Sequence, residues 1–233
     1  MTHFVLVHGS WHGAWCWADQ IAVLNEYGHT ATAVELPSDK VDVGASDYAR
    51  LIAAAVRNPG QDVVVGHSMS GLALPLVPDH VEVSALVYLA SLIPDPGVSW
   101  IEQSRVVPPM SGWFYEHALP HQQRDVEGRL RWPPDVAEEL FFHDCPKDVA
   151  RHAVTQLRPQ SPTPMSESSP VAKFPEVPSY YLACEDDRTI SPAWASSVVP
   201  ARLGTVPVSI PGSHSPFLAR PRFLADTIFD LLC

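Results

Sequence analysis

The chain has 233 residues, enough for one domain that holds a single hydrophobic core and one elaborated insertion. Its 15 Lys and Arg stand against 26 Asp and Glu, and the formal net charge of −11 disfavours nucleic acid as a partner because a phosphate backbone would be repelled. The N-terminal apolar stretch is too short for a secretory signal and no apolar run approaches the ~20 residues of a membrane span, so we expect a soluble cytoplasmic protein with no membrane partner.

Short apolar runs rich in strand-forming residues alternate with helix-compatible segments along most of the chain. The strand-like runs are residues 4–7, 30–34, 62–65, 85–89, 179–184 and 207–210. The helix-compatible segments are residues 17–27, 45–57, 70–76, 192–198 and 222–232. Several strand-like runs are apolar on both sides, as buried parallel strands are. The alternation therefore predicts an α/β fold with a parallel sheet.

The stretch from about 94 to 177 breaks this alternation, because it is rich in Pro and in aromatic residues. Apolar residues recur at helical spacing around 136–142 and 149–157. The Pro- and Ser-rich segment 159–170 has the composition of a connecting loop. We expect a mostly helical cap inserted into one domain that spans residues 1–233.

The third strand-like run ends in a Gly-flanked serine, Ser68, within the sequence Gly-His-Ser-Met-Ser-Gly. A strand followed by such a serine and then by a helix is typical of a nucleophile elbow, where the serine Oγ stands clear of the backbone. The usual pattern G-x-S-x-G has Gly two places after the serine, whereas here Ser70 stands there and Gly71 follows. Serine is small enough for the turn. The alternative is that Ser68 caps a helix N-terminus.

A serine nucleophile needs a base, a group that orients this base, and donors for the oxyanion. His214 lies on a Gly-containing loop after the sixth run, where a base belongs in the order Ser, acid, His; the alternative is a solvated loop histidine. The fifth run ends in Glu-Asp-Asp, and we select Asp187 as the orienting acid, with Asp186 second and Asp95 a further alternative.

The first strand-like run ends in a Gly-rich turn, His-Gly-Ser-Trp-His-Gly. Such a turn aims a backbone N–H at the pocket, so we expect the N–H groups of Ser10 and Met69 to be the oxyanion donors. Metal binding by His8 and His12 is the rival interpretation, but no third ligand is spaced nearby, and we expect no metal. The four cysteines are widely spaced without C-x-x-C, so we expect free thiols.

With these motifs the chain resembles the α/β-hydrolase superfamily, and within it the branch of plant methylesterases, hydroxynitrile lyases and their bacterial relatives. The most specific match is the opening HFVLVHGSWHGAWCW at residues 3–17, and the segments around Ser68, Asp187 and His214 follow in the family's order and spacing. The resemblance implies the α/β-hydrolase fold: a six-stranded, mainly parallel sheet flanked by helices, with a helical cap. It also implies no cofactor and, in many members, a homodimer.

The two chemistries of this branch differ at two positions. Hydroxynitrile lyases of this type carry Thr after the first-strand His and Lys after the catalytic His, whereas this chain has Gly9 and Ser215. Nothing at Ser215 supplies the positive charge that stabilises cyanide, so ester hydrolysis is favoured over cyanohydrin cleavage. The resemblance thus implies a serine hydrolase that forms an acyl-enzyme on Ser68.

The expected substrate is a small, fairly apolar carboxylic ester, for which a methyl ester or a lactone is suitable. Aromatic residues of the cap and its surroundings are candidates to contact it, although such residues also form cap cores. The candidates are Trp11, His12, Trp113, Trp132 and Phe217, with Phe114, Tyr115, Phe141 and Phe142 as further cap aromatics. Two alternative functions remain open: a lyase, C–C hydrolase or cyclase with His214 as base, and a non-catalytic ligand-binding module.

Overall fold

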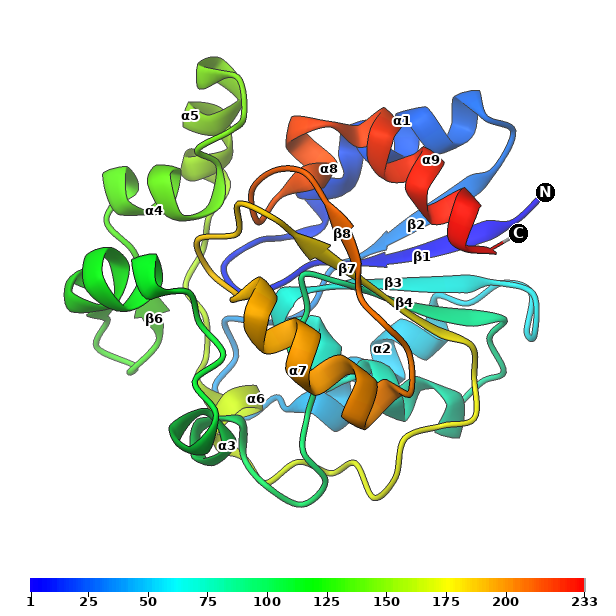
Figure 1. The fold of residues 1–233 in the computed structure, drawn as a ribbon, viewed down its shortest axis with the longest axis horizontal. Helices are drawn as coiled ribbons and strands as arrows, with labels where there is room; N and C mark the ends of the chain where they lie inside the picture. The colour runs from blue at the N-terminus through cyan, green and yellow to red at the C-terminus, as the bar shows by residue number, and fades with distance from the viewer. Residues whose placement is uncertain (233) are drawn as a thin grey trace.

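The computed structural model describes residues 1–232, and its centre is a six-stranded sheet in the order β2-β1-β3-β4-β7-β8 (Figure 1). All five neighbouring pairs in this sheet are parallel. The strands are β1 His3–Val7, β2 Thr30–Val34, β3 Val63–His67, β4 Ala85–Leu89, β7 Ser179–Cys184 and β8 Val208–Ile210. Each predicted strand is present, and the predicted α/β-hydrolase fold with a parallel sheet is confirmed.

Successive side chains of the strands point to opposite faces, and each face is covered by helices. In β1, Val5 and Val7 join one core, and Phe4 and Leu6 join the other. One face is covered by α2 (Ala45–Ala54) and α7 (Pro192–Leu203). The other is covered by α1 (Ala18–Glu26), α8 (Pro216–Ala219) and α9 (Pro221–Leu232), with the short 3₁₀ helix η1 (Ala14–Trp17) before α1. This three-layer arrangement buries both faces of the strands, which explains why the strand sequences are apolar on both sides.

The helix expected over residues 70–76 is not an α-helix. The segment forms two 3₁₀ helices instead, η2 (Ser68–Leu72) and η3 (Leu74–Asp79). Pro75 has no N–H for the fourth preceding carbonyl, and its ring would clash with that carbonyl in an α-helix. Pro78 repeats this disruption inside η3. The chain after Ser68 therefore tightens into 3₁₀ turns, which close with bonds to the third preceding residue.

The segment expected to form a cap has helices as most of its regular elements and lies over the end of the sheet where the strands stop, opposite the two chain termini (Figure 1). It also contains a two-stranded antiparallel hairpin that the sequence did not predict. The cap elements are α3 Trp100–Val106, η4 Phe114–Ala118, η5 Leu119–His121, β5 Gln123–Arg124, β6 Leu130–Arg131, α4 Pro134–Phe141, α5 Lys147–Gln156 and α6 Thr163–Ser166. The last of these lies within the segment predicted to be a loop. The cap has a hydrophobic cluster of its own, which includes Phe141 and Phe142.

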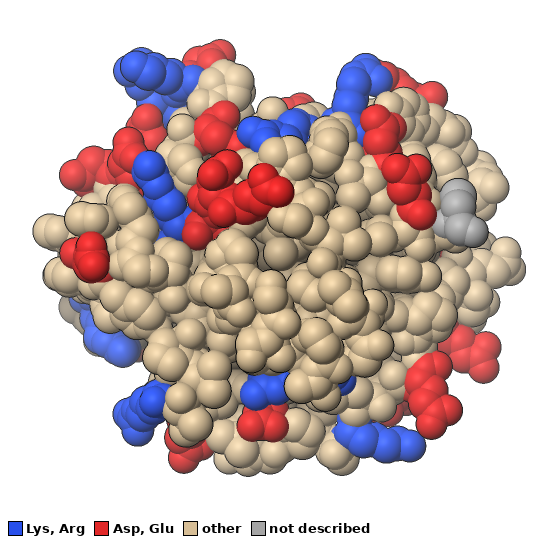
Figure 2. All heavy atoms as spheres, in the orientation of Figure 1, with Lys and Arg blue, Asp and Glu red and all other residues tan. Residues whose placement is uncertain are grey.

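Acidic and basic side chains both occur on the face shown in Figure 2, and several of the acidic ones lie in groups. Several of them form ion pairs, such as Arg222 with Glu26 and Arg188 with Glu139. Within residues 1–232, no helix is long and apolar enough to cross a membrane. Cys16, Cys145 and Cys184 are free thiols, as predicted, and Cys233 lies outside the described residues.

Candidate active site

Ser68 lies at the turn directly after β3, with a backbone φ of 54°. This left-handed conformation is rare for a residue with a side chain, and it is the strained geometry of a nucleophile elbow. Gly71 shows why a small residue is needed nearby, since an added Cβ would lie 2.1 Å from the carbonyl oxygen of Leu92. Ser70 instead has room, and its Oγ donates to the carbonyl oxygen of His67 at 2.8 Å. The motif's departure from the usual pattern is thus compatible with the turn.

Three side chains from three loops form one hydrogen-bonded chain at the carboxyl end of the sheet. The Nε2 of His214 lies 3.0 Å from Ser68 Oγ, and its Nδ1 lies 2.8 Å from Asp187 Oδ2. The backbone N–H groups of Thr189 and Ile190 donate to the other carboxylate oxygen of Asp187, at 2.7 and 3.0 Å. The carboxylate is therefore fixed on both sides, and it fixes the tautomer and the orientation of the imidazole.

The other carboxylates considered for this position lie elsewhere. Glu185 and Asp186 are exposed, whereas Asp187 is only 6% exposed. Asp95 lies in the loop after β4, where its carboxylate is 3.5 Å from the guanidinium of Arg202. Of the predicted acids, only Asp187 contacts His214 among the described residues.

The turn that follows β1 lies beside Ser68 because β1 and β3 are neighbours in the sheet. The chain leaves β1 for β2 on one side, and β3 lies on the other side, so this is a topological switch point, where open α/β sheets bind ligands. Ser10 and Met69 both line the cavity that Ser68 enters, and their role as oxyanion donors stays a prediction. Gly9 makes the approach possible, since an added Cβ would lie only 2.6 Å from the Cβ of Ser68.

Four buried histidines, His8, His12, His67 and His214, lie near this turn. The sequence did not predict the structural contacts of the first three. The Nδ1 of His8 contacts the carbonyl of Gly9 at 2.8 Å, while its Nε2 accepts from the N–H of Leu36 at 3.0 Å. Because both nitrogens are engaged, His8 is a poor metal ligand. Among the described residues, no group of three His, Cys, Asp or Glu side chains is arranged to hold a metal ion.

His67 and His12 are fully buried, and burial lowers the pKa of both. The pKa of His12 falls to about 3, and that of His67 falls well below the ordinary value. The neutral His67 donates from Nε2 to the backbone carbonyl of His214 at 2.9 Å, and the two rings lie 4.5 Å apart. His67 therefore positions His214. Its place immediately before Ser68 was the only sequence signal for this role.

The cavity beside Ser68 has a volume of about 200 Å³ and is lined mostly by apolar side chains. We call it the catalytic cavity. Its lining residues are Ser10, Trp11, Ser68, Met69, Leu92, Ile101, Met110, Phe114, Leu119, Gln122, Arg124, Leu130, Pro162, Met165, Thr189 and Ile190. Most of these come from the cap and were not predicted, because unbranched and aliphatic residues carry no sequence signal that separates cavity lining from core.

Of the five residues predicted to contact substrate, Trp11 lines this cavity and the other four do not. His12 is buried behind the turn, where its ring stacks on Trp15. Phe217 is fully buried against His67, with ring centroids 4.9 Å apart. Both rings are packed against buried neighbours and do not line the catalytic cavity, and their contact with substrate stays a prediction.

The two cap tryptophans also lie outside the catalytic cavity. Trp113 faces Arg188, whose guanidinium carbon lies 4.9 Å from the ring centroid. Trp132 packs edge-on against Trp11 and lines a different cavity. Their contact with substrate stays a prediction. Of the further cap aromatics, Phe114 is the one that lines the catalytic cavity.

Comparison with known proteins agrees with this geometry. The model of the alpha/beta hydrolase family matches residues 4–227. Methylesterase 2 of Arabidopsis thaliana is 28% identical, over 98% of this chain and 95% of its own length. Norfluorocurarine synthase 2 of a Strychnos species is also 28% identical, over 98% of this chain and 94% of its own. The crystal structure of a pyrethroid hydrolase from Sphingobium faniae superposes with a TM-score of 0.79 at 26% identity, covering 99% of this chain and 97% of that one. The chain therefore belongs to the alpha/beta hydrolase family.

Proposed function

We propose that the protein is a serine carboxylic-ester hydrolase that acts on a small, fairly apolar ester through an acyl-enzyme on Ser68. The observation that carries this proposal is the hydrogen-bonded chain from Ser68 through His214 to Asp187, whose serine end enters an apolar cavity under the cap. The relatives named methylesterase and pyrethroid hydrolase support ester hydrolysis as the reaction.

In the acylation step, Ser68 Oγ attacks the ester carbonyl while His214 Nε2 takes its proton as a general base. Asp187 stabilises the imidazolium that forms. The N–H groups of Ser10 and Met69 donate to the oxyanion of the tetrahedral intermediate. The intermediate collapses to the acyl-enzyme, and His214 returns the proton to the alcohol that leaves.

Deacylation repeats these steps with water as the nucleophile. His214 takes a proton from the water as it attacks the acyl carbonyl, and the carboxylic acid leaves when Ser68 Oγ regains its proton. His67 stays neutral in both steps because burial and the nearby His214 lower its pKa. A neutral His67 adds no repulsive charge when His214 becomes cationic.

The cavity supports a small substrate. At about 200 Å³ it is smaller than the cavities that hold drug-sized ligands, roughly 300–1,000 Å³. Its lining is mostly aliphatic and aromatic, and it includes Leu92, Met110 and Ile190. A methyl ester or a small lactone fits this volume and polarity.

Cyanohydrin cleavage is not supported by the geometry. A threonine in place of Gly9 would bring its Cβ within 2.6 Å of the Cβ of Ser68. Ser215 is fully buried and supplies no cation beside His214. Because one relative is named a synthase, norfluorocurarine synthase 2, the alternative to hydrolysis is a lyase or cyclase reaction with His214 as the base.

Hydrolysis of p-nitrophenyl acetate by the Ser68→Ala variant tests the proposal. We expect kcat/KM to fall on the order of 10⁴-fold or more, because the nucleophile and its base act as a unit. Ser196→Ala is the matched control, since Ser196 is an exposed serine on α7. Full activity in Ser68→Ala would overturn the proposal, and turnover of another substrate that survives this change would favour the alternative.

A further inference from the structure

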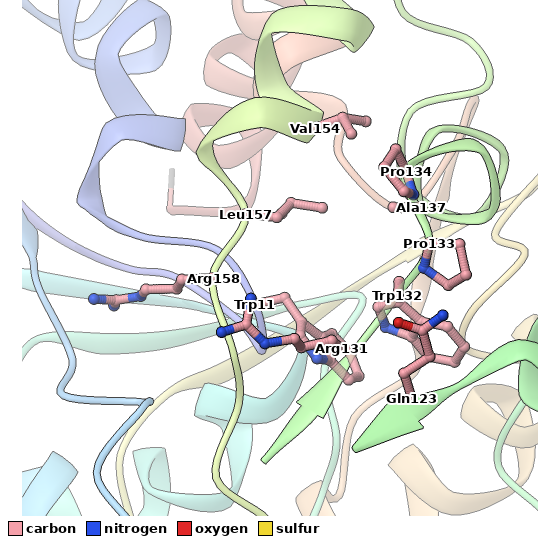
Figure 3. Close-up of a pocket in the computed structure, with 10 residues that line it drawn as sticks. All are labelled: Trp11, Gln123, Arg131, Trp132, Pro133, Pro134, Ala137, Val154, Leu157 and Arg158. Atoms are coloured by element: carbon pink, nitrogen blue, oxygen red, sulfur yellow. The ribbon is translucent and has the colours of Figure 1, made fainter. Parts of the chain in front are cut away.

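A second cavity of about 350 Å³ lies next to the catalytic cavity, enclosed by the hairpin β5–β6, the start of α4 and the end of α5 (Figure 3). Figure 3 shows Trp11 between Arg158 and Trp132, with Leu157 and Val154 above. We call this space the second cavity. The guanidinium of Arg158 is held elsewhere, since it pairs with Glu35 and donates to the carbonyl of Leu36. Only the stem of Arg158 is therefore available to the second cavity.

The hairpin β5–β6 separates the two cavities, because its side chains alternate between them. Gln123 pairs with Arg131, and both line the second cavity. The adjacent pair, Arg124 with Leu130, lines the catalytic cavity. This is the alternation that strand geometry requires, so the two faces of one hairpin border two different spaces.

Trp11 completes this partition. Among the described residues it is the only one that lines both cavities. Its indole N–H donates to the carbonyl of Leu130 on the hairpin at 3.0 Å, and its ring lies 5.4 Å from that of Trp132 and 5.6 Å from that of Phe141. Its own carbonyl accepts from the N–H of Arg158 at 2.9 Å. The side chain is therefore held in one position.

The backbone of Trp11 is in the left-handed region, with φ of 64°. This conformation is rare for a residue with a side chain, and it persists only where the surrounding contacts impose it. The strained turn directs the indole between the two cavities. Trp11 directly follows Ser10, whose N–H we assign as an oxyanion donor. Trp11 is therefore next in the chain to a proposed oxyanion donor and lies at the boundary between the two cavities.

We propose that Trp11 sets the upper size limit of the substrate by closing the catalytic cavity off from the second cavity. This inference rests on the proposed ester hydrolysis and names its specificity-determining residue. Without the indole, the two spaces join, and the room beside Ser68 more than doubles. The added space is lined by polar side chains on the hairpin and by apolar surface from Leu157, Val154 and Ala137, and this apolar side accepts the hydrocarbon chain of a longer ester.

The test compares the wild-type protein with Trp11→Ala and Trp11→Gly. Glycine suits the positive φ, so Trp11→Gly preserves the turn even if alanine disturbs it. The substrates are p-nitrophenyl esters from acetate to decanoate, and acetate esters of alcohols from methanol to octanol. We expect the ratio of kcat/KM for the long to the short members of one series to rise by about tenfold or more in both variants.

A blocking variant shows whether the gain depends on the second cavity. Leu157→Trp fills that cavity from the position directly after α5 without touching the catalytic cavity. Added to Trp11→Gly, it is expected to remove the gain for long esters and to leave the activity toward the acetate unchanged relative to Trp11→Gly. Trp113→Ala is the matched control, because Trp113 is a cap tryptophan that lines neither cavity.

The outcomes separate this inference from the proposed function. If the wild-type protein hydrolyses short esters but both folded Trp11 variants keep its chain-length profile in both series, the size-limit inference is wrong and ester hydrolysis stands. A gain that survives Leu157→Trp also overturns the inference, since the second cavity is then not the added space. If the wild-type protein hydrolyses no ester, the proposed function itself fails.

Discussion

Asp186 and Asp187 are neighbours in the chain, yet only Asp187 faces His214. The turn after β7 directs Asp187 inward, where two backbone N–H groups hold its second oxygen. Sequence position predicted that this residue would lie beside His214, because the order Ser, acid, His places the acid at the end of this strand. The same reasoning could not choose the aromatics that line the catalytic cavity, since a buried ring looks the same in sequence whether it packs or lines a cavity.

The variant Asp187→Asn removes the charge and keeps the shape of this side chain. We expect kcat for ester hydrolysis to fall on the order of 10⁴-fold, because the amide holds the wrong imidazole tautomer and does not stabilise the imidazolium. The measurement is steady-state hydrolysis of p-nitrophenyl acetate. Asp186→Asn is the matched control and should retain wild-type kcat. Equal losses in the two variants would show that Asp187 has no special role.

The turns after β1 and β3 approach each other so closely that position 9 has no room for a side chain. Their parent strands are adjacent in the sheet, and an added Cβ at Gly9 would also lie 2.9 Å from Nδ1 of His67. The strands themselves follow from their apolar sequences. The hairpin β5–β6 could not be predicted from the sequence, because two residues per strand are too few to show an alternating pattern. The 3₁₀ turns after Ser68 were not predicted either, because they arise from prolines within a segment that has a helical pattern.

We therefore expect Gly9→Ala to displace the elbow. The clash should cost about 1–3 kcal/mol of unfolding free energy, as overpacking of a tight contact does, and it should lower kcat/KM by at least about tenfold. Chemical denaturation and ester hydrolysis measure the two effects. Gly112→Ala is the matched control, since an added Cβ there meets nothing within 4 Å. Wild-type activity and stability in Gly9→Ala would contradict the close approach.

For the molecule as a whole, the buried histidines make folding stability depend on pH. The pKa of His12 is about 3 in the folded protein and ordinarily 6.5, and burial is the main cause. Below a pH of about 6.5, His12 therefore binds a proton in the unfolded chain but not in the folded protein. The stabilisation is fully present above that pH and is lost as the pH falls toward 3. His67 acts in the same direction.

We expect the free energy of unfolding to fall between pH 6.5 and pH 5, with each such histidine contributing up to about 1.4 kcal/mol per pH unit. Urea denaturation across this range measures the slope. His12→Phe keeps an aromatic ring among Phe141, Phe142 and Trp15, and it should give a shallower slope. The exposed His152 provides the control His152→Gln, which should match the wild-type slope. An unchanged slope in His12→Phe would contradict the burial argument.

The most direct test of the site is to identify the residue that a fluorophosphonate modifies. A serine activated by a neighbouring base reacts with this probe, whereas an ordinary serine does not. Digestion of the labelled, folded protein and mass spectrometry locate the adduct. We predict one adduct on Ser68, absent in Ser68→Ala and strongly reduced in His214→Ala. An adduct on another serine, or no adduct on a protein that remains folded, would contradict the assignment of Ser68 as an activated nucleophile.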